Sequence, residues 1–184
     1  LVEYDNESYF KSHTHVSLPS HYSFSWYLKC DTNRKVIFIS GEICSGKDTV
    51  MNRDYSADFY KQIDLGQLVR EKFQTADRIF DNNLEPYFVE RVKEITADNK
   101  FTYIITGLRQ PSLAQKLSAL FDEVKHIYLT VPRDILEWRY GARADVKDAN
   151  ISFKDAIAGD QSLGMKDLQY YLLTEVKCDF INNY

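Results

Sequence analysis

The segment from Gly41 to Thr49 constrains the fold of this chain more than any other, because it has the spacing of a phosphate-binding loop. A glycine is followed by four residues, by Gly46 and Lys47, and then, after one further residue, by a threonine. The preceding run Val36–Ser40 is apolar and β-branched, which predicts a buried strand. The following segment can be helical. A strand, a glycine-bearing turn and a helix start together form a cradle for phosphate groups.

The residue types in this loop suit the chemistry of a nucleoside triphosphate. Glycines let several backbone N–H groups point at one anion, and the helix N-terminus adds donors and partial positive charge. Lys47 can reach the terminal phosphates, and the hydroxyl of Thr49 can hold Mg²⁺. We therefore predict ATP and Mg²⁺ as cofactors; a chance match in a glycine-bearing turn is the alternative. The predicted ATP-binding residues are Gly41, Cys44, Ser45, Gly46, Lys47, Asp48 and Thr49.

Composition narrows the class of protein. The chain has 184 residues, 44% of them hydrophobic, which is enough for one domain with a full core. A net charge of -4 argues against a nucleic-acid or membrane-surface binder. No apolar run is long enough to span a bilayer. Three widely spaced cysteines (Cys30, Cys44 and Cys178) predict no disulfide framework and favour a reducing, cytoplasmic compartment.

The chain divides by pattern into two parts. Residues 1–34 show no clear periodicity and are predicted to be an extension or the remnant of a preceding module. Residues 35–184 alternate between strands and helices, which predicts a three-layer α/β/α sandwich with a five-stranded parallel sheet. The predicted strands are Val36–Ser40, Phe59–Asp64, Phe101–Thr106, His126–Val131 and Asp179–Asn182. The predicted helical segments are Leu65–Phe73, Phe88–Ile95, Leu113–Phe121, Ile135–Arg143 and Met165–Lys177.

Four arginines are placed where they could act on phosphate. Arg70 and Arg109 each follow a predicted strand, so both should lie at the carboxyl edge of the sheet, where ligands bind in such folds. A guanidinium group binds phosphate oxygens in a bidentate way, which suits a second, phosphate-bearing ligand. Arg139 and Arg143 are four residues apart and would share a helix face. Surface salt bridges are the alternative for each of these arginines.

The order of motifs resembles P-loop nucleotide kinases of the adenylate kinase-like group. Gly66–Arg70 is similar to the segment of that group that holds the acceptor's phosphate. Ile104–Gln110 and Leu129–Arg143 are similar to the third strand, fourth strand and lid helix of phage deoxynucleoside monophosphate kinases and archaeal dephospho-CoA kinase-like proteins. Phe153–Asn183, which contains Asp160, resembles the closing segment of the archaeal proteins.

This resemblance implies an enzyme that moves the γ-phosphate of ATP to a nucleoside monophosphate-like small molecule. The implied catalytic residues are Lys47, Arg109, Arg139 and Arg143, and the implied acceptor-binding residues are Arg70 and Arg109. Kinases of dephospho-CoA or of a phosphorylated mevalonate, and a non-catalytic ATP-binding regulator, remain as alternatives. The sequence does not predict an oligomeric state.

Two positions depart from the pattern of that group. The third strand usually ends in an aspartate that helps to hold magnesium, and here that residue is Thr106. We predict that Asp64, at the end of the neighbouring strand, takes over this role together with Thr49. The aspartate of the acceptor motif is replaced by Gln67, which leaves room for an unusual acceptor.

Overall fold

The computed structural model describes residues 33–75, 81–98, 100–143 and 151–183. The predicted N-terminal extension, residues 1–34, therefore lies outside the described residues except for its last two. The boundary between the two predicted parts stays a prediction.

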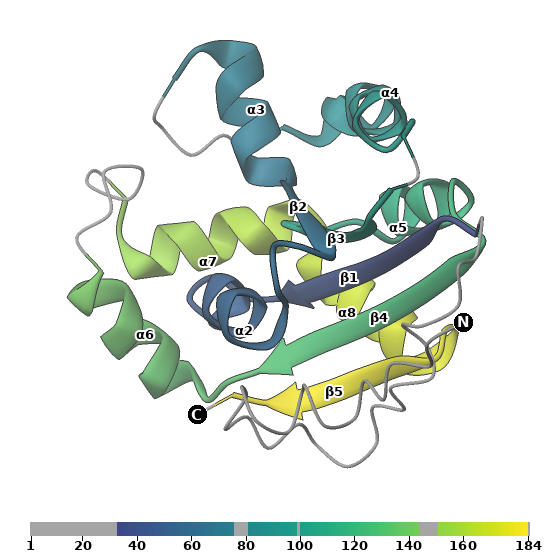
Figure 1. The fold of residues 1–184 in the computed structure, drawn as a ribbon. Coiled ribbons are helices and arrows are strands. Elements are labelled where there is room, and N and C mark those ends of the chain that lie inside the picture. Colours follow the sequence, from purple (N-terminus) through teal and green to yellow (C-terminus); the bar gives the residue numbers. More distant parts are fainter. Residues whose placement is uncertain (1–32, 76–80, 99, 144–150, 184) are drawn as a thin grey trace, which may run out of the picture. The chain divides into compact units, whose positions relative to one another are not determined.

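A five-stranded parallel sheet forms the centre of the fold, as predicted (Figure 1). Its order is β2-β3-β1-β4-β5. The strands lie close to the predicted ranges, although β4 begins at Glu123 rather than His126. Their bounds are β1 Lys35–Gly41, β2 Tyr60–Asp64, β3 Thr102–Thr106, β4 Glu123–Thr130 and β5 Cys178–Asn182.

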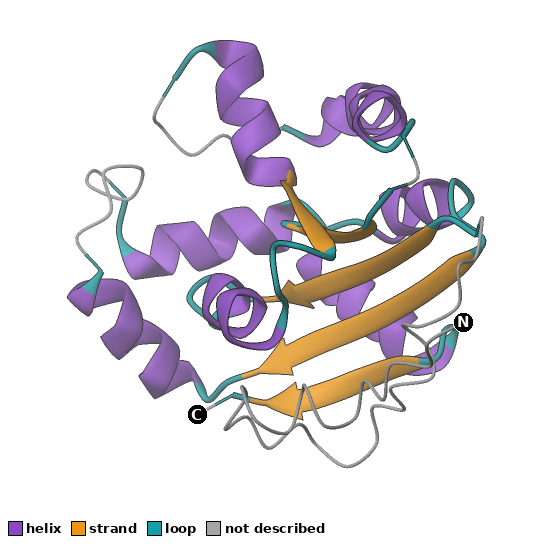
Figure 2. Ribbon diagram, viewed as in Figure 1, coloured by secondary structure: helices purple, strands orange, loops and turns teal. Residues whose placement is uncertain are grey.

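Helices flank the sheet, which confirms the predicted α/β class (Figure 2). The helices are α2 Lys47–Asp54, α3 Leu65–Phe73, the short 3-10 helix η2 Asn82–Leu84, α4 Glu85–Ile95, α5 Pro111–Ser118, α6 Arg133–Ala142, α7 Phe153–Ser162 and α8 Met165–Thr174. Among the residues described, no helix combines the length and the apolar character that crossing a membrane requires.

Helix α7 is an element that the sequence analysis missed. The hydroxyl of Ser152 caps its N-terminus by accepting a hydrogen bond from the Asp155 backbone N–H at 3.1 Å. A serine followed three residues later by an acidic residue is the kind of local pattern that marks a helix start. The helix is short and buries only Ala156, Ile157 and Asp160, so its apolar stripe is too brief to stand out.

Side-chain alternation along β1 divides the core between the two faces of the sheet. Val36 and Phe38 pack in one cluster with buried residues of α3, α4, α5 and α8. Successive residues of a strand point to opposite faces, so Ile37 and Ile39, which are also buried, face away from this cluster. Phe73 is the last residue of α3 and is 45% exposed, whereas Leu65, Leu68 and Val69 of the same helix are buried.

His126 of β4 makes the stability of the fold depend on pH. It is 5% exposed and stacks on Phe38, with 4.9 Å between ring centroids. Burial lowers the pKa of His126 from 6.5 to about 4. The unfolded chain therefore binds the proton more readily, so this contribution to stability is complete above about pH 6.5 and is lost as the pH falls toward 4.

We expect His126 to account for a loss of about 2–3 kcal/mol in the free energy of unfolding between pH 7.5 and pH 4.5. Urea titrations at the two pH values measure the loss, and the His126→Phe variant, which keeps an aromatic ring against Phe38, is the comparison. The variant should lose less stability over the same range. An equal loss in both proteins would show that His126 is not the group responsible.

Candidate phosphate-binding loop and adjoining cleft

The loop between β1 and α2 has the backbone conformation of an anion cradle. Gly41, Cys44 and Gly46 have φ angles of 147°, 60° and 85°. Such left-handed residues turn successive N–H groups toward a common side. Gly46 is also the residue before α2, whose first amides lack partners within the helix. The described structure therefore supports the phosphate loop that the spacing predicts.

Three distant elements hold the outer side of this loop. The side chain of Asn183, just after β5, donates to the Ser45 carbonyl oxygen at 2.8 Å. Arg139 of α6 donates to the carbonyl oxygens of Cys44 at 3.4 Å and Asn183 at 3.1 Å. Ile43 packs in a cluster with residues of α7. These contacts use carbonyl oxygens and side chains rather than the backbone N–H groups of the loop.

Lys47 folds back over the loop that precedes it. Its Nζ donates to the carbonyl oxygens of Gly41 at 2.9 Å and Glu42 at 2.8 Å, and lies 3.3 Å from the Ser45 Oγ. Burial lowers the pKa of Lys47 to about 8, while the nearby Asp160 carboxylate acts in the opposite direction. The ammonium group is therefore still largely protonated at neutral pH and can exchange carbonyl partners for phosphate oxygens.

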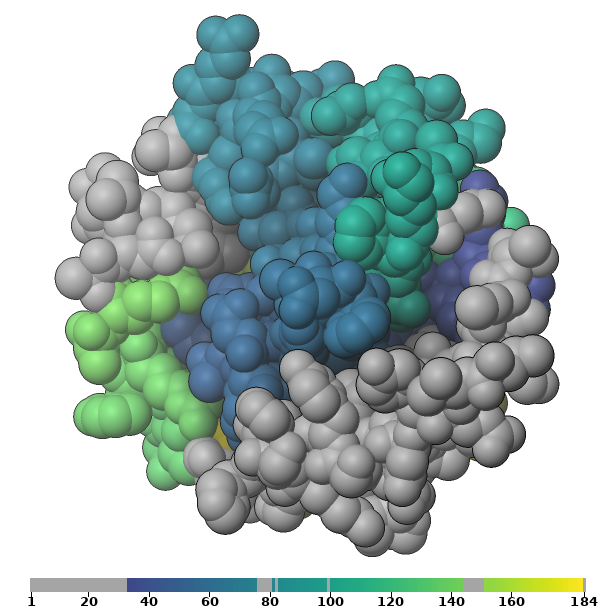
Figure 3. Space-filling model, in the orientation of Figure 1, coloured from purple at the N-terminus to yellow at the C-terminus, as the bar shows by residue number. Residues whose placement is uncertain are grey.

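The two residues after Lys47 lie on the first turn of α2, and both are exposed. Figure 3 shows the atoms of α2 at the surface of the molecule on the face drawn there. The Thr49 hydroxyl is thus accessible to a magnesium ion, but nothing else in the structure bears on that role. The magnesium-binding role of Thr49 stays a prediction, as does the ATP-binding role of Asp48.

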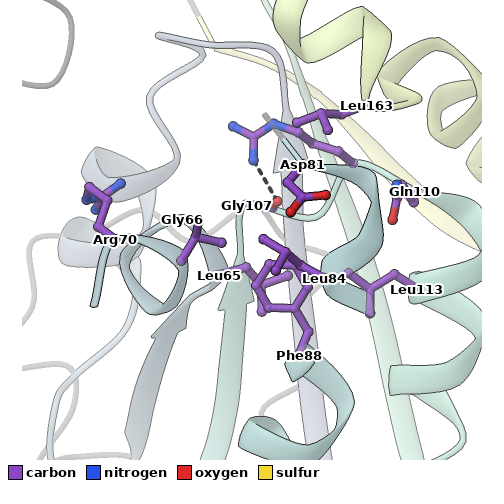
Figure 4. A pocket seen from close by; sticks show the side chains of 12 residues that line it. Leu65, Gly66, Arg70, Asp81, Leu84, Phe88, Gly107, Gln110, Leu113 and Leu163 are labelled. Carbon is purple, nitrogen blue, oxygen red and sulfur yellow. Dashed lines mark hydrogen bonds between the residues drawn. The ribbon is translucent and has the colours of Figure 1, made fainter. Parts of the chain in front are cut away.

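A cleft of about 560 Å³, its open mouth included, brings together the two arginines that were predicted to bind an acceptor (Figure 4). Arg70 comes from α3, and Arg109 from the segment after β3. Figure 4 shows Asp81 among the side chains around the same cleft. The remaining lining residues are Leu65, Gly66, Val69, Leu84, Phe88, Gly107, Gln110, Leu113 and Leu163. The cleft thus combines an apolar wall with a few charged groups, as small-molecule sites do.

Asp64 has a structural role in addition to any role toward a metal ion. Its Oδ1 accepts from the Gly66 N–H at 2.9 Å and caps α3, while its Oδ2 lies 3.5 Å from Arg70. Asp64 also pairs with Thr106 across β2 and β3, so it lies beside the position where the kinases that the sequence resembles carry an aspartate. Within the described part of the chain, no group of three or more His, Cys, Asp or Glu side chains could hold a metal. The magnesium role of Asp64 stays a prediction.

Arg109 is held by a residue to which the sequence analysis gave no role. Its Nε donates to Asp160 Oδ1 at 2.8 Å, and its Nη1 donates to the Gly107 carbonyl oxygen at 3.0 Å. Asp160 belongs to α7 and is 2% exposed. In the sequence, Asp160 is one acidic residue in a segment that mixes apolar and polar residues. Nothing in that segment identifies Arg109 as its partner.

The predicted lid pair, Arg139 and Arg143, does not share a helix face as expected. α6 ends at Ala142, and Arg143 follows it in an extended conformation with φ -90° and ψ 97°. Arg139 contacts the phosphate loop at the Cys44 carbonyl oxygen. Gly141 lies in the last turn of α6 and weakens the helix there, because glycine is a poor helix former.

The five-stranded parallel sheet with flanking helices and a glycine-bearing loop after β1 is a fold that several solved kinases share. A gluconokinase from Sinorhizobium meliloti is similar with a TM-score of 0.56 and 14% identity, covering 81% of this chain and 82% of that chain. A sugar kinase from Janibacter sp. is similar with a TM-score of 0.51 and 18% identity, covering 81% and 84%. Shikimate kinase from Bacteroides thetaiotaomicron has a TM-score of 0.50 and 17% identity, covering 81% and 86%.

At sequence identities of 14%, 18% and 17%, the similarity to these three structures establishes the fold alone. No family model matches the sequence, and no curated protein is significantly similar to it.

Proposed function

We propose that the protein is an ATP-dependent kinase that transfers the γ-phosphoryl group of ATP to a nucleoside monophosphate-like acceptor. The observation that carries the proposal is the placement of Arg70 and Arg109 in one cleft next to the phosphate loop. The two sites adjoin through α7, which packs on the loop at Ile43 and binds Arg109 through Asp160. Two guanidinium groups in one cleft match the charge of an acceptor that itself carries a phosphate.

Phosphoryl transfer depends mainly on positioning and on charge neutralisation. The loop amides and Lys47 would bind the β- and γ-phosphates of ATP, while Arg70 and Arg109 would orient the acceptor. Thr49 and Asp64 would hold Mg²⁺, which neutralises phosphate charge when bound. Arg139 and Arg143 would stabilise negative charge in the transition state. An acceptor phosphate oxygen needs no general base, which agrees with the lack of an obvious one in the sequence.

A second candidate is a kinase of a small hydroxy acid. Asp81 lines the cleft together with the arginines, so a carboxylate could bind the guanidinium groups while an alcohol faces Asp81. Two proteins with the same fold are named for gluconate and shikimate, which are ligands of this kind. A kinase of dephospho-CoA or of a phosphorylated mevalonate would bind the phosphate of its acceptor in the same cleft, through Arg70 and Arg109.

An acceptor screen that measures ADP release separates these possibilities. The panel contains nucleoside and deoxynucleoside monophosphates, dephospho-CoA, phosphomevalonate, gluconate and shikimate, each with ATP and Mg²⁺. The Lys47→Ala protein, purified in parallel, is the blank for contaminating kinases. Acceptor-dependent release with a monophosphate supports the proposal, and release with a hydroxy acid supports the second candidate. ADP binding without transfer to any acceptor would support a non-catalytic regulator.

Arg70→Ala should weaken acceptor binding by about 10–100-fold and change ATP binding much less. A hydrogen bond to a charged group contributes about 1.5–3 kcal/mol, and Arg70 lies in the acceptor cleft rather than in the loop. Acceptor KM and ATP KM, measured separately, give the two effects. Arg91→Ala is the matched control, since Arg91 is an exposed arginine paired with Glu94 on α4. Equal losses for both substrates would contradict the role of Arg70.

Asp64→Asn should raise the Mg²⁺ concentration needed for half-maximal turnover by roughly tenfold. The fold should be retained because asparagine caps helices about as well as aspartate does. A magnesium titration of turnover, with unfolding monitored separately, gives both results. Undiminished turnover at every Mg²⁺ concentration would remove Asp64 from the metal site.

A further inference from the structure

Asp160 of α7 forms a buried ion pair with Arg109 of the acceptor cleft. The Nε of Arg109 donates to Asp160 Oδ1 at 2.8 Å, and the Asp160 side chain is 2% exposed. The other carboxylate oxygen, Oδ2, has no hydrogen-bond partner among the described residues. Buried ion pairs often stabilise a fold no better than apolar side chains of similar size would. Stability alone is therefore a weak explanation for this pair.

Two contacts fix the direction of the Arg109 guanidinium group. Its Nε is held by Asp160, and its Nη1 donates to the Gly107 carbonyl oxygen at 3.0 Å. Its Nη2 makes no hydrogen bond to a described residue. Arg109 also lines the cleft together with Arg70. A carboxylate bound at Nε leaves the terminal edge of the guanidinium group for the oxygens of a ligand, and that edge can bind phosphate in a bidentate way.

The packing of α7 sets the position of the carboxylate. Ala156 and Ile157 of this helix pack with Ile43 of the phosphate loop. Asp160 follows them by one helical turn, so it lies on the same side of the helix. The helix therefore touches the phosphate loop with its apolar residues and holds Arg109 with its carboxylate. The location of Arg109 is thus referred to the loop through one rigid element.

We propose that Asp160 is a positioning residue that fixes Arg109 relative to the phosphate loop, so that the acceptor's phosphate is bound at a set place beside ATP. The inference rests on the proposed function, in which Arg109 binds the acceptor. Phosphoryl transfer depends on the alignment of donor and acceptor, and a small misplacement slows such a reaction strongly. An arginine free to change rotamer would bind the acceptor in several directions.

Binding of inorganic phosphate tests the inference without any knowledge of the acceptor. The protein is first saturated with Mg–AMP-PNP, a nonhydrolysable ATP analogue that would fill the phosphate loop, and phosphate is then titrated by calorimetry. Asp160→Asn should weaken phosphate binding by roughly tenfold, because a weaker bond then holds Arg109. Removal of a negative charge near an anion site would by itself strengthen binding. The direction of the change therefore separates positioning from electrostatics.

Two further variants isolate the role of the carboxylate. Asp155→Asn, at an exposed position on the same helix, removes the same charge and should leave phosphate affinity unchanged. In an Arg109→Ala background, Asp160→Asn should cause no further loss, because the residue through which it acts is gone. A purely structural role would give the same loss in both backgrounds. That result, or a phosphate affinity that Asp160→Asn leaves unchanged or raises, would overturn the inference.

Side-chain NMR of the unsubstituted protein decides the matter if Asp160→Asn does not fold. The Nε–H signal of Arg109, assigned by its absence from the spectrum of Arg109→Lys, should exchange slowly with water before and after phosphate is added. Phosphate should shift the Nη signals of the same residue. Rapid exchange in the phosphate-free protein, or no response to phosphate, would overturn the inference. A complete lack of Mg–AMP-PNP binding would instead overturn the proposed function.

Discussion

Replacement of Lys47 by alanine is expected to lower turnover by roughly 10²–10³-fold, the largest effect on activity that the structure predicts. One donor aimed at charge that develops in the transition state is worth about 3–4 kcal/mol. The stability of the fold should change little, because Lys47 bonds to loop carbonyl oxygens that water can satisfy instead. Turnover with the acceptor found in the screen, and the midpoint of thermal unfolding, are the two measurements.

Lys166→Ala is the matched control for this prediction. Lys166 is an exposed lysine on α8, so its loss removes the same charge from the protein without touching the loop. It should leave turnover unchanged. If Lys47→Ala keeps turnover close to that of the control, Lys47 does not act on the transferred phosphoryl group, and the loop has another function.

Gly41→Ala is expected to have the largest effect on stability, a loss of about 3 kcal/mol and about 10 °C in Tm. Gly41 has φ 147°, which disfavours any residue with a Cβ. A Cβ there would also lie 2.6 Å from Ser45 Oγ and 2.8 Å from the backbone oxygen of Leu129. The serine could rotate away, but the strand oxygen could not, so β1, β4 or the loop must shift. The altered geometry of the loop should also lower the affinity of the protein for ADP.

Gly141→Ala makes the same chemical change at a position where nothing opposes it. Gly141 lies in α6, and a Cβ there meets no atom within 4 Å. Alanine favours the helix over glycine by about 1 kcal/mol, so this variant should be as stable as the parent or slightly more so. Urea unfolding and ADP calorimetry on both variants give the comparison. A Gly41→Ala protein with parental stability would show that the junction between β1 and the loop has room to adapt.

Where local pattern carried the information, prediction from the sequence succeeded. The strands were found because a buried parallel strand is a short apolar run, and the parallel order followed from their alternation with helices. The convergence of Arg70 and Arg109 followed from a topological rule, since both residues come just after strands of one parallel sheet. Prediction failed where the signal was weak or the outcome depended on neighbours, as at α7 and at the end of α6.

The sequence by itself determined the phosphate loop. Its glycines, Lys47 and the flanking strand and helix are consecutive in the chain, so their spacing alone specifies the local backbone. Only the tertiary structure decided what surrounds that loop. Asp160 reaches Arg109 across 51 residues of chain, and Asn183 reaches Ser45 across 138. Such contacts depend on how α7 and β5 pack against the rest of the fold, because the free energy of a buried ion pair or hydrogen bond is set by its surroundings rather than by local sequence.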